Sequence, residues 1–249
     1  TLPGSAPTMC KGQTVLFLHD AGANGNSFSA VMDELADSHS PISLDFPGHG
    51  RSGSLDSLSS ITAFAEHAEA LMLGWEVPSL VIVGEGLGAA VGLELAQRGN
   101  LEVSCLICIG AVGATVDLAD EIAELESITA GKARRNFNTS GYAPDPDESV
   151  LREAFAQWVK TDPRATLGAR RAQHAWNESV DLKGLSTPTV VVVGEHADPS
   201  SVAASESLAQ TLSNSTVEVL AGAGIHGPIE QPEAFASLIS RSAEEMTRS

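Results

Sequence analysis

A strand, a glycine-framed turn and a helix follow one another in residues 79–98, and this stretch constrains the fold most strongly. Residues 80–83 form a short apolar, β-branched run, which is typical of a buried strand. Gly84, Gly86 and Gly88 then interrupt the run, and residues 89–98 have the composition of a helix. A buried strand that turns sharply into a helix favours a parallel sheet with helices packed on it.

The rest of the chain repeats this alternation of strands and helices. The strands are continuously apolar, which indicates burial on both faces, and 249 residues with 43% apolar content can enclose one large core. We therefore predict an α/β fold with a mostly parallel, doubly wound sheet. The further strands are predicted at residues 14–19, 42–46, 103–109, 189–193 and 216–220, and the further core helices at 28–36, 61–74, 203–212 and 232–246.

The strand pattern disappears in the middle of the chain. Helices are predicted there at residues 118–127, 148–158 and 164–176. We therefore expect an inserted helical lid over residues 113–177, with the core formed by 1–112 and 178–249. The lid holds 8 of the 14 basic residues, which either draw in an anionic ligand or pair with nearby acids on exposed helix faces. They are Lys132, Arg134, Arg135, Arg152, Lys160, Arg164, Arg170 and Arg171.

Composition excludes several classes of partner. A net charge of −18 opposes binding to nucleic acid and to anionic membranes. Cys105 and Cys108 fall on opposite faces of one strand, and together with Cys10 they have no metal-ligand spacing, so we expect buried free thiols in a reducing compartment. With no signal-peptide pattern and no apolar run of about 20 residues, the expected location is cytoplasmic. We expect no metal, because His196 lacks a ligand set around it. We also expect no cofactor.

Five segments occur in the order that they have in the α/β-hydrolase superfamily. They are residues 18–22, 45–52, 84–88, 192–199 and 222–233. From residue 14 onward the chain resembles this superfamily, and the resemblance implies the α/β-hydrolase fold. The stretch 84–88 is then similar to the family's nucleophile elbow, Gly-x-Ser-x-Gly. Gly86 takes the place of the serine, so no acyl-enzyme can form there.

The resemblance also implies the other parts of a catalytic site. The backbone N–H groups of Leu87 and Ala21 correspond to the oxyanion hole. Asp20 stands where the family usually has a glycine, and a carboxylate beside this hole opposes a developing oxyanion unless it points away. Asp198 and His226 correspond to the acid and the base, although each is displaced by one residue from the family register.

Two structural alternatives remain open for these residues. Asp198 is suited to the start of a helix, and His226 to a surface loop. We interpret Glu85 as a structural neighbour of the elbow, because the central side chain of such a turn is the one that points into the site. The pattern Gly84-x-Gly86-x-x-Ala89 also fits a dinucleotide fingerprint, but the next strand does not end in the acidic residue that this fingerprint requires.

These features favour three functions. The first is an enzyme that acts on a small organic compound, such as an ester, a lactone or a related carbonyl compound, with an anionic substrate among the options. It would use the His226–Asp198 pair and the backbone oxyanion hole without an elbow serine. The second is an ordinary serine esterase or lactonase inactivated at position 86. The third is a non-catalytic ligand-binding or interaction protein on a hydrolase scaffold. In each case the expected partner is a small molecule.

Overall fold

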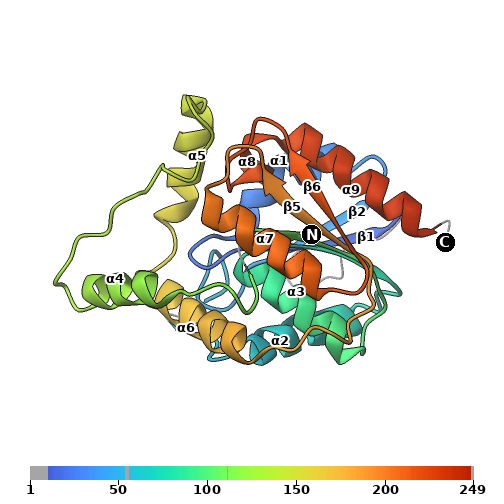
Figure 1. Ribbon diagram of the computed structural model, residues 1–249, viewed down its shortest axis with the longest axis horizontal. Coiled ribbons are helices and arrows are strands. Elements are labelled where there is room, and N and C mark those ends of the chain that lie inside the picture. The colour runs from blue at the N-terminus through green and yellow to red at the C-terminus, as the bar shows by residue number, and fades with distance from the viewer. Residues whose placement is uncertain (1–10, 54–55, 111, 248–249) are drawn as a thin grey trace.

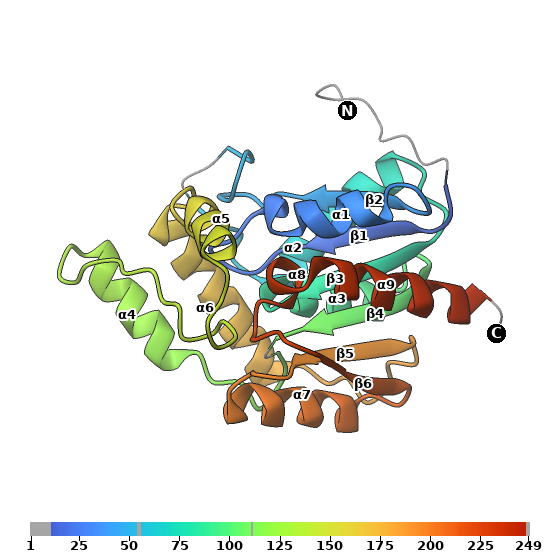
Figure 2. The same cartoon turned by 90° about the horizontal axis from the view of Figure 1, so that it is seen from above.

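The computed structural model describes residues 11–53, 56–110 and 112–247. Within these residues six parallel strands form one sheet (Figure 1), in the order β2-β1-β3-β4-β5-β6 that Figure 2 shows with every strand labelled. The predicted mostly parallel α/β fold is therefore confirmed. The strands are β1 (Thr14–Leu18), β2 (Ser40–Leu44), β3 (Leu80–Glu85), β4 (Val103–Ile109), β5 (Thr189–Gly194) and β6 (Ser215–Leu220).

Helices cover both faces of the sheet, because alternate residues of each strand point to opposite sides. One face packs against α1 (Ser29–Leu35) and α9 (Pro232–Thr247), where Phe17 meets Phe28 and Phe235 in one apolar cluster. The other face packs against α2 (Ile61–Gly74), α3 (Leu87–Arg98) and α7 (Pro199–Thr211) (Figure 2). Cys105 belongs to the first cluster and Cys108 to the second, so the expected opposite orientation of the two thiols is confirmed. Cys10 lies outside the described residues.

A helical insertion separates β4 from β5. It consists of α4 (Ala119–Thr129), α5 (Glu148–Trp158) and α6 (Pro163–Ser179), as the sequence predicts. Asp162 caps α6 by accepting the Arg164 amide at 2.8 Å, and Pro163 occupies the first turn, where its missing N–H costs nothing. Ala172 and Trp176 of α6 pack into the main core, so α6 connects the insertion to the sheet. Figure 2 shows α4 projecting away from the strands.

Two short elements border the carboxyl end of the sheet. The 3-10 helix η1 (Gly25–Phe28) is capped by Asn24, and α8 (Gly227–Glu230) follows the segment that carries His226. No helix in the described part of the chain has the length and apolar content needed to cross a bilayer.

Candidate active site

The turn between β3 and α3 is as sharp as the glycine pattern indicates. Gly86 connects Glu85 to Leu87 with φ 50° and ψ −107°, a region that favours glycine. A Cβ atom at Gly88 would overlap the backbone carbonyl of Leu18, so β1 can approach α3 only at a residue without a side chain. The turn therefore places Gly86 and its neighbours at the carboxyl end of the sheet.

The carboxylate of Asp20 lies directly over Gly86. Its Oδ1 accepts a hydrogen bond from the Leu87 amide at 2.8 Å, and the Ala21 amide also helps to lower the pKa of this carboxylate. A Cβ atom built on Gly86 would overlap the carboxylate group. Of the two N–H donors that resemblance assigns to the oxyanion hole, that of Leu87 is thus already occupied by an anion from the chain itself, and that of Ala21 stabilises the same anion.

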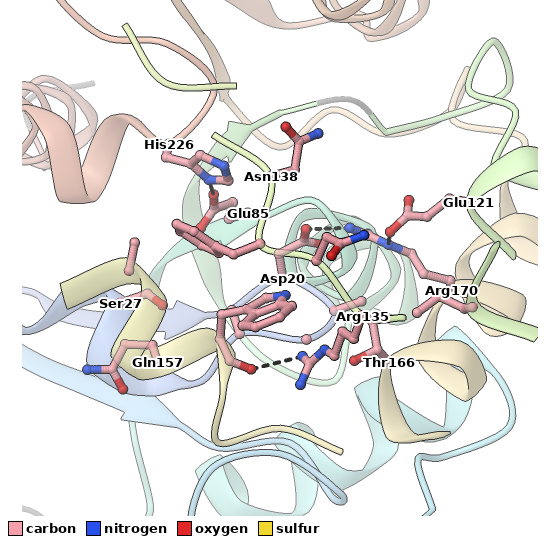
Figure 3. A pocket seen from close by; sticks show the side chains of 18 of the residues that line it. Asp20, Ser27, Glu85, Glu121, Arg135, Asn138, Gln157, Thr166, Arg170 and His226 are labelled. Carbon is pink, nitrogen blue, oxygen red and sulfur yellow. Dashed lines mark hydrogen bonds and ion pairs between the residues drawn. The ribbon is translucent and has the colours of Figure 1, made fainter. Parts of the chain in front are cut away.

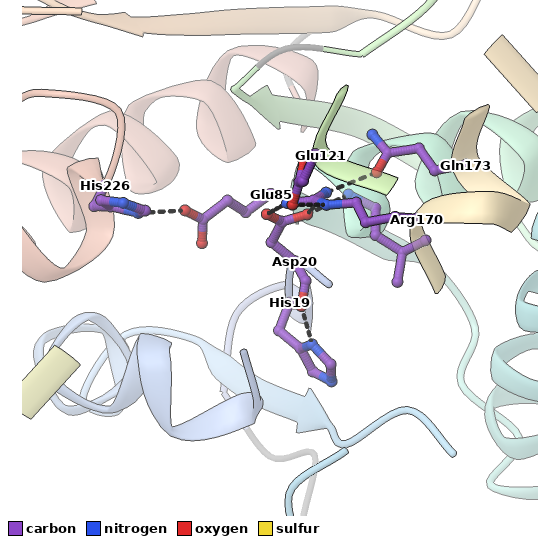
Figure 4. A network of polar contacts seen from close by, with 8 residues as sticks. His19, Asp20, Glu85, Glu121, Arg170, Gln173 and His226 are labelled. Carbon is purple, nitrogen blue, oxygen red and sulfur yellow. Dashed lines mark hydrogen bonds and ion pairs between the residues drawn. The ribbon is translucent and has the colours of Figure 1, made fainter. Parts of the chain in front are cut away.

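Arg170 of α6 holds Asp20 in this position. Its guanidinium pairs with both carboxylate oxygens at 2.7 Å and also contacts Glu121 of α4 at 2.8 Å (Figure 4). Burial raises the pKa of Asp20, but the charge and hydrogen bonds of Arg170 outweigh burial, and the net shift is downward. Burial lowers the pKa of Arg170, but Asp20 and Glu121 raise it above its usual value. Asp20 therefore stays ionised at neutral pH.

His19 fixes the loop that carries Asp20. The Phe46 amide donates to its Nε2 at 3.0 Å, so the proton resides on Nδ1, which lies 2.7 Å from the Asp20 carbonyl oxygen and donates to it. Burial and then the neighbouring His49 lower the pKa of His19 to about 4. The ring is therefore neutral and fully buried, and its role is to position the loop.

A second acidic residue, Glu85, pairs with His226. The His226 Nδ1 lies 3.4 Å from the Glu85 Oε1 (Figure 4). The Tyr142 ring packs against the imidazole at a tilt of 36°, with 4.5 Å between ring centroids. Burial lowers the pKa of His226, but the hydrogen bond and charge of Glu85 outweigh it and the net shift is upward. Glu230 secures the histidine segment by accepting the amides of Gly224 and His226, and it accepts the Ala143 amide from the insertion as well.

The expected pairing of His226 with Asp198 is not found. Asp198 is exposed and caps α7, where its carboxylate accepts the Ser200 and Ser201 amides and both hydroxyl groups. These hydrogen bonds lower the pKa of Asp198 to about 2, and the one from the Ser200 hydroxyl has the largest effect on this pKa. The helix begins at Pro199, four residues earlier than predicted, because Asp-Pro is a strong start signal. The alternative interpretation of Asp198 as a helix cap therefore describes its position.

Replacement of Asp198 by alanine tests this placement. Because the substitution removes a helix cap, we expect the free energy of unfolding to fall by about 1 kcal/mol. Urea denaturation measures this change. Any activity of the protein should stay within about twofold of the wild type, because the capping principle predicts a local effect on α7 alone. A loss of activity with unchanged stability would contradict the placement.

A cavity of about 300 Å³ lies between the sheet edge and the helical insertion (Figure 3). Asp20, Ala21, Glu85 and His226 line it from the core. Gly86 and Leu87 are buried, and the Asp20 carboxylate covers Gly86. Asp198 does not border the cavity. The interpretation of Glu85 as only a structural neighbour of the elbow is wrong, because its side chain lines the cavity and contacts His226. Tyr142 also lines the cavity, and no sequence signal pointed to it. The apolar wall comes from the insertion and consists of Leu125, Ile128, Phe137, Ala154 and Trp158.

The basic residues of the insertion have different surroundings. Arg164 pairs with Asp162, Arg170 with Asp20 and Glu121, and Arg171 with Glu126. The pairs of Arg164 and Arg171 match the expectation of paired charges on exposed helix faces, whereas the pair of Arg170 with Asp20 is largely buried and does not. Among the described residues, no group of three or more His, Cys, Asp or Glu side chains is arranged to hold a metal ion.

The sheet order, the glycine elbow and the histidine after the last strand define an α/β protein of the hydrolase type. The chain belongs to the alpha/beta hydrolase family, whose sequence model matches residues 15–238. The fold is similar to that of MenH from S. aureus, with a TM-score of 0.80 and 17% identity over 98% of this chain and 97% of that one. It is also similar to a thermophilic esterase from Thermogutta terrifontis, with a TM-score of 0.77 and 22% identity over 95% and 91%.

Sequence relatives match shorter stretches. Protein phosphatase methylesterase 1 of Gibberella zeae is 33% identical over 109 residues, which cover 39% of this chain and 27% of that protein. The chain spans 31% of the length of the mycobacterial relatives that it matches. These relatives and the solved structures support a hydrolase scaffold.

Proposed function

We propose that this chain is an enzyme that transfers a proton to or from a small organic substrate at His226, without a covalent intermediate at residue 86. The observation that carries the proposal is the contact between His226 and Glu85 at the cavity wall. The Nδ1 atom faces Glu85, which leaves Nε2 to exchange a proton with the substrate. We also propose that α4 and α5, which supply the apolar wall, act as a lid that keeps water from the reacting atoms.

Tyr142 is suited to stabilise the oxygen that becomes negative in such a reaction. Burial raises the pKa of its hydroxyl, and the charges of Glu85 and Glu230 raise it further, so the group remains a neutral donor. Tyr142 lines the same cavity as His226. When His226 removes a proton from a carbon next to a carbonyl group, the electron pair moves to the carbonyl oxygen, which accepts a hydrogen bond from Tyr142.

The position of Asp20 supports a reaction without a serine nucleophile. A tetrahedral intermediate would need the Leu87 and Ala21 amides, but Leu87 already donates to the Asp20 carboxylate and Ala21 stabilises the same anion. Displacing this anion would leave Arg170 without its main partner. Esterase or lactonase chemistry inactivated only at residue 86 is therefore disfavoured. Binding without catalysis is the second candidate, favoured by the same filled hole.

Exchange of carbon-bound hydrogen in D2O tests the proposal without a known substrate. Proton NMR would follow a panel of small ketones, keto acids and lactones with the wild type, His226→Gln and Asp198→Asn. We expect the wild type and Asp198→Asn to exchange at least one compound, and His226→Gln to be at least about 100-fold slower. Equal rates for the wild type and His226→Gln would contradict the proposal. The absence of exchange in all three proteins would favour the binding protein.

The rate should also depend on pH in a defined direction. His226 acts as a base only when it is neutral, and its pKa is raised above the usual value near 6.5. The rate should therefore rise with pH and level off above that shifted pKa. In Glu85→Gln the midpoint should move to lower pH, because the charge that favours imidazolium is gone. A pH–rate profile of the exchange reaction measures both midpoints, and an unchanged midpoint in Glu85→Gln would exclude Glu85 as the partner.

A further inference from the structure

The cavity contains a second polar region, formed by Arg135 and Thr166. Both residues line the cavity, and Figure 3 shows them at the opposite side of the view from His226. Thr166 borders the loop at residues 22–23 directly, and Arg135 is connected to this loop through Thr161. The Thr166 hydroxyl would contact a Cβ atom built on Gly22, and Arg135 bonds to Thr161, whose hydroxyl donates to Ala23.

Arg135 is held in place without a carboxylate partner. Its guanidinium donates to the carbonyl oxygens of Thr161 and Trp158, each at 2.8 Å, and stacks 4.0 Å from the centre of a Trp158 ring. In the described part of the chain it forms no ion pair, unlike the arginines of α6. Burial lowers the pKa of Arg135 and the more distant charge of Asp162 raises it, yet a guanidinium remains charged at neutral pH. The result is a positioned cation at the cavity with hydrogen-bonding capacity to spare.

Thr166 provides an independent observation. Its side chain lies in the first turns of α6 and the residue is only 8% exposed. Its hydroxyl oxygen is buried and has no hydrogen-bond partner among the described residues. An unsatisfied buried hydroxyl costs free energy, so its presence at a cavity wall points to a polar group of a ligand.

The other cations at the cavity are already paired with carboxylates, so the region of Arg135 and Thr166 is the part of the cavity suited to an anion. Asp20 and Glu121 are both bonded to Arg170, and Glu85 faces His226, whose raised pKa favours a positive charge. Glu124 is an exposed residue of α4. Among the described residues that line the cavity, Arg135 is therefore the one cation to which no carboxylate is bonded.

We propose that Arg135 and Thr166 bind the carboxylate group of the substrate, and that the apolar wall of α4 and α5 holds its hydrocarbon body. This deepens the proposed function, on which it rests, by naming the substrate class: a small carboxylic acid with an apolar chain or ring. The carboxylate accepts from the guanidinium and from the Thr166 hydroxyl, both of which favour an anion. Binding at this region leaves the rest of the molecule to reach toward His226.

Binding of 3-phenylpropanoate, compared with its uncharged amide, tests the site without requiring turnover. Isothermal titration would use the wild type, Arg135→Gln and Thr166→Val, with the exposed neighbouring Arg134→Gln as the matched control. We expect the acid to bind the wild type at least 10-fold more tightly than the amide. Arg135→Gln should remove this preference and Thr166→Val, which keeps the side-chain shape, should reduce it severalfold. Arg134→Gln should retain it.

Two outcomes would overturn the site. One is equal affinity of the wild type for acid and amide. The other is a preference that survives in both Arg135→Gln and Thr166→Val but disappears in His226→Gln, which would place the carboxylate at the imidazolium instead. If His226→Gln loses the exchange reaction but still prefers the acid to the amide, different residues bind the carboxylate and transfer the proton, and both proposals stand. If no protein catalyses exchange and the preference still depends on Arg135, the carboxylate site stands and the proposed reaction fails.

Discussion

Replacement of Arg170 by methionine is expected to lower the free energy of unfolding by about 3 kcal/mol at neutral pH. The substitution keeps an unbranched apolar stem but leaves the Asp20 carboxylate ionised and without its cation, in a site where the side chains of Arg170 and Asp20 are 13% and 23% exposed. This loss is a large part of the 5–15 kcal/mol that stabilises a typical domain. Urea denaturation with a common m-value measures it.

The same pair predicts how the effect depends on pH. In the wild type the pKa of Asp20 is lowered, so the pair contributes stability above the usual aspartate pKa and loses it as the pH falls. In Arg170→Met the effect of burial, which raises the pKa of Asp20, is opposed only by the Leu87 and Ala21 amides, so this pKa should be higher than in the wild type and the variant gains relative stability when Asp20 becomes protonated. The difference in the free energy of unfolding between the wild type and Arg170→Met should therefore become smaller toward acidic pH.

Arg171→Met is the matched control for this prediction. Arg171 pairs with Glu126 at 2.7 Å, but both side chains are about half exposed, at 56% and 50%. Its loss should change the free energy of unfolding by less than about 1 kcal/mol. Similar effects of the two substitutions would show that Arg170 does not hold a buried charge.

Restoring a serine at residue 86 should fail unless Asp20 is removed as well. A side chain at Gly86 meets the Asp20 carboxylate and must adopt a positive φ, so Gly86→Ser should lower the stability by about 1–3 kcal/mol. The oxyanion donors remain occupied. We therefore expect Gly86→Ser to show no reaction with a fluorophosphonate that labels activated serines.

The double variant Asp20→Gly/Gly86→Ser removes both obstacles. The Leu87 and Ala21 amides become free, His226 remains near the elbow through Glu85, and Arg170 keeps Glu121 as a partner. We expect labelling of this variant, and loss of labelling when His226→Gln is added. Mass spectrometry of the intact protein measures the adduct. Full labelling of Gly86→Ser alone would show that Asp20 does not occupy the nucleophile position.

The fold could be predicted from the sequence because its signals are local. The apolar strands and the glycine elbow each depend on neighbouring residues, and the elements formed close to where the pattern placed them. The start of α7 was missed even though Asp198 and Pro199 carry a strong local signal, because the same aspartate also matched the family's acid position. Choosing between these roles requires the direction of its side chain.

The site was less predictable because its contacts join distant parts of the chain. Arg170 and Asp20 are 150 residues apart, and His226 and Glu85 are 141 apart, so no periodicity relates them. The sequence indicated that a carboxylate at residue 20 conflicts with an oxyanion hole. It did not indicate that this carboxylate fills the space left by the missing side chain of Gly86, which depends on how the loop after β1 approaches the elbow.

The titration of His226 by NMR of the imidazole nitrogens tests the central claim most directly, because it requires no substrate. The claim is that Glu85 is the partner of His226 in the cavity. It predicts a pKa above 6.5 in the wild type, a lower pKa in Glu85→Gln, and no change in Asp198→Asn. A His226 pKa that falls in Asp198→Asn and stays constant in Glu85→Gln would contradict it.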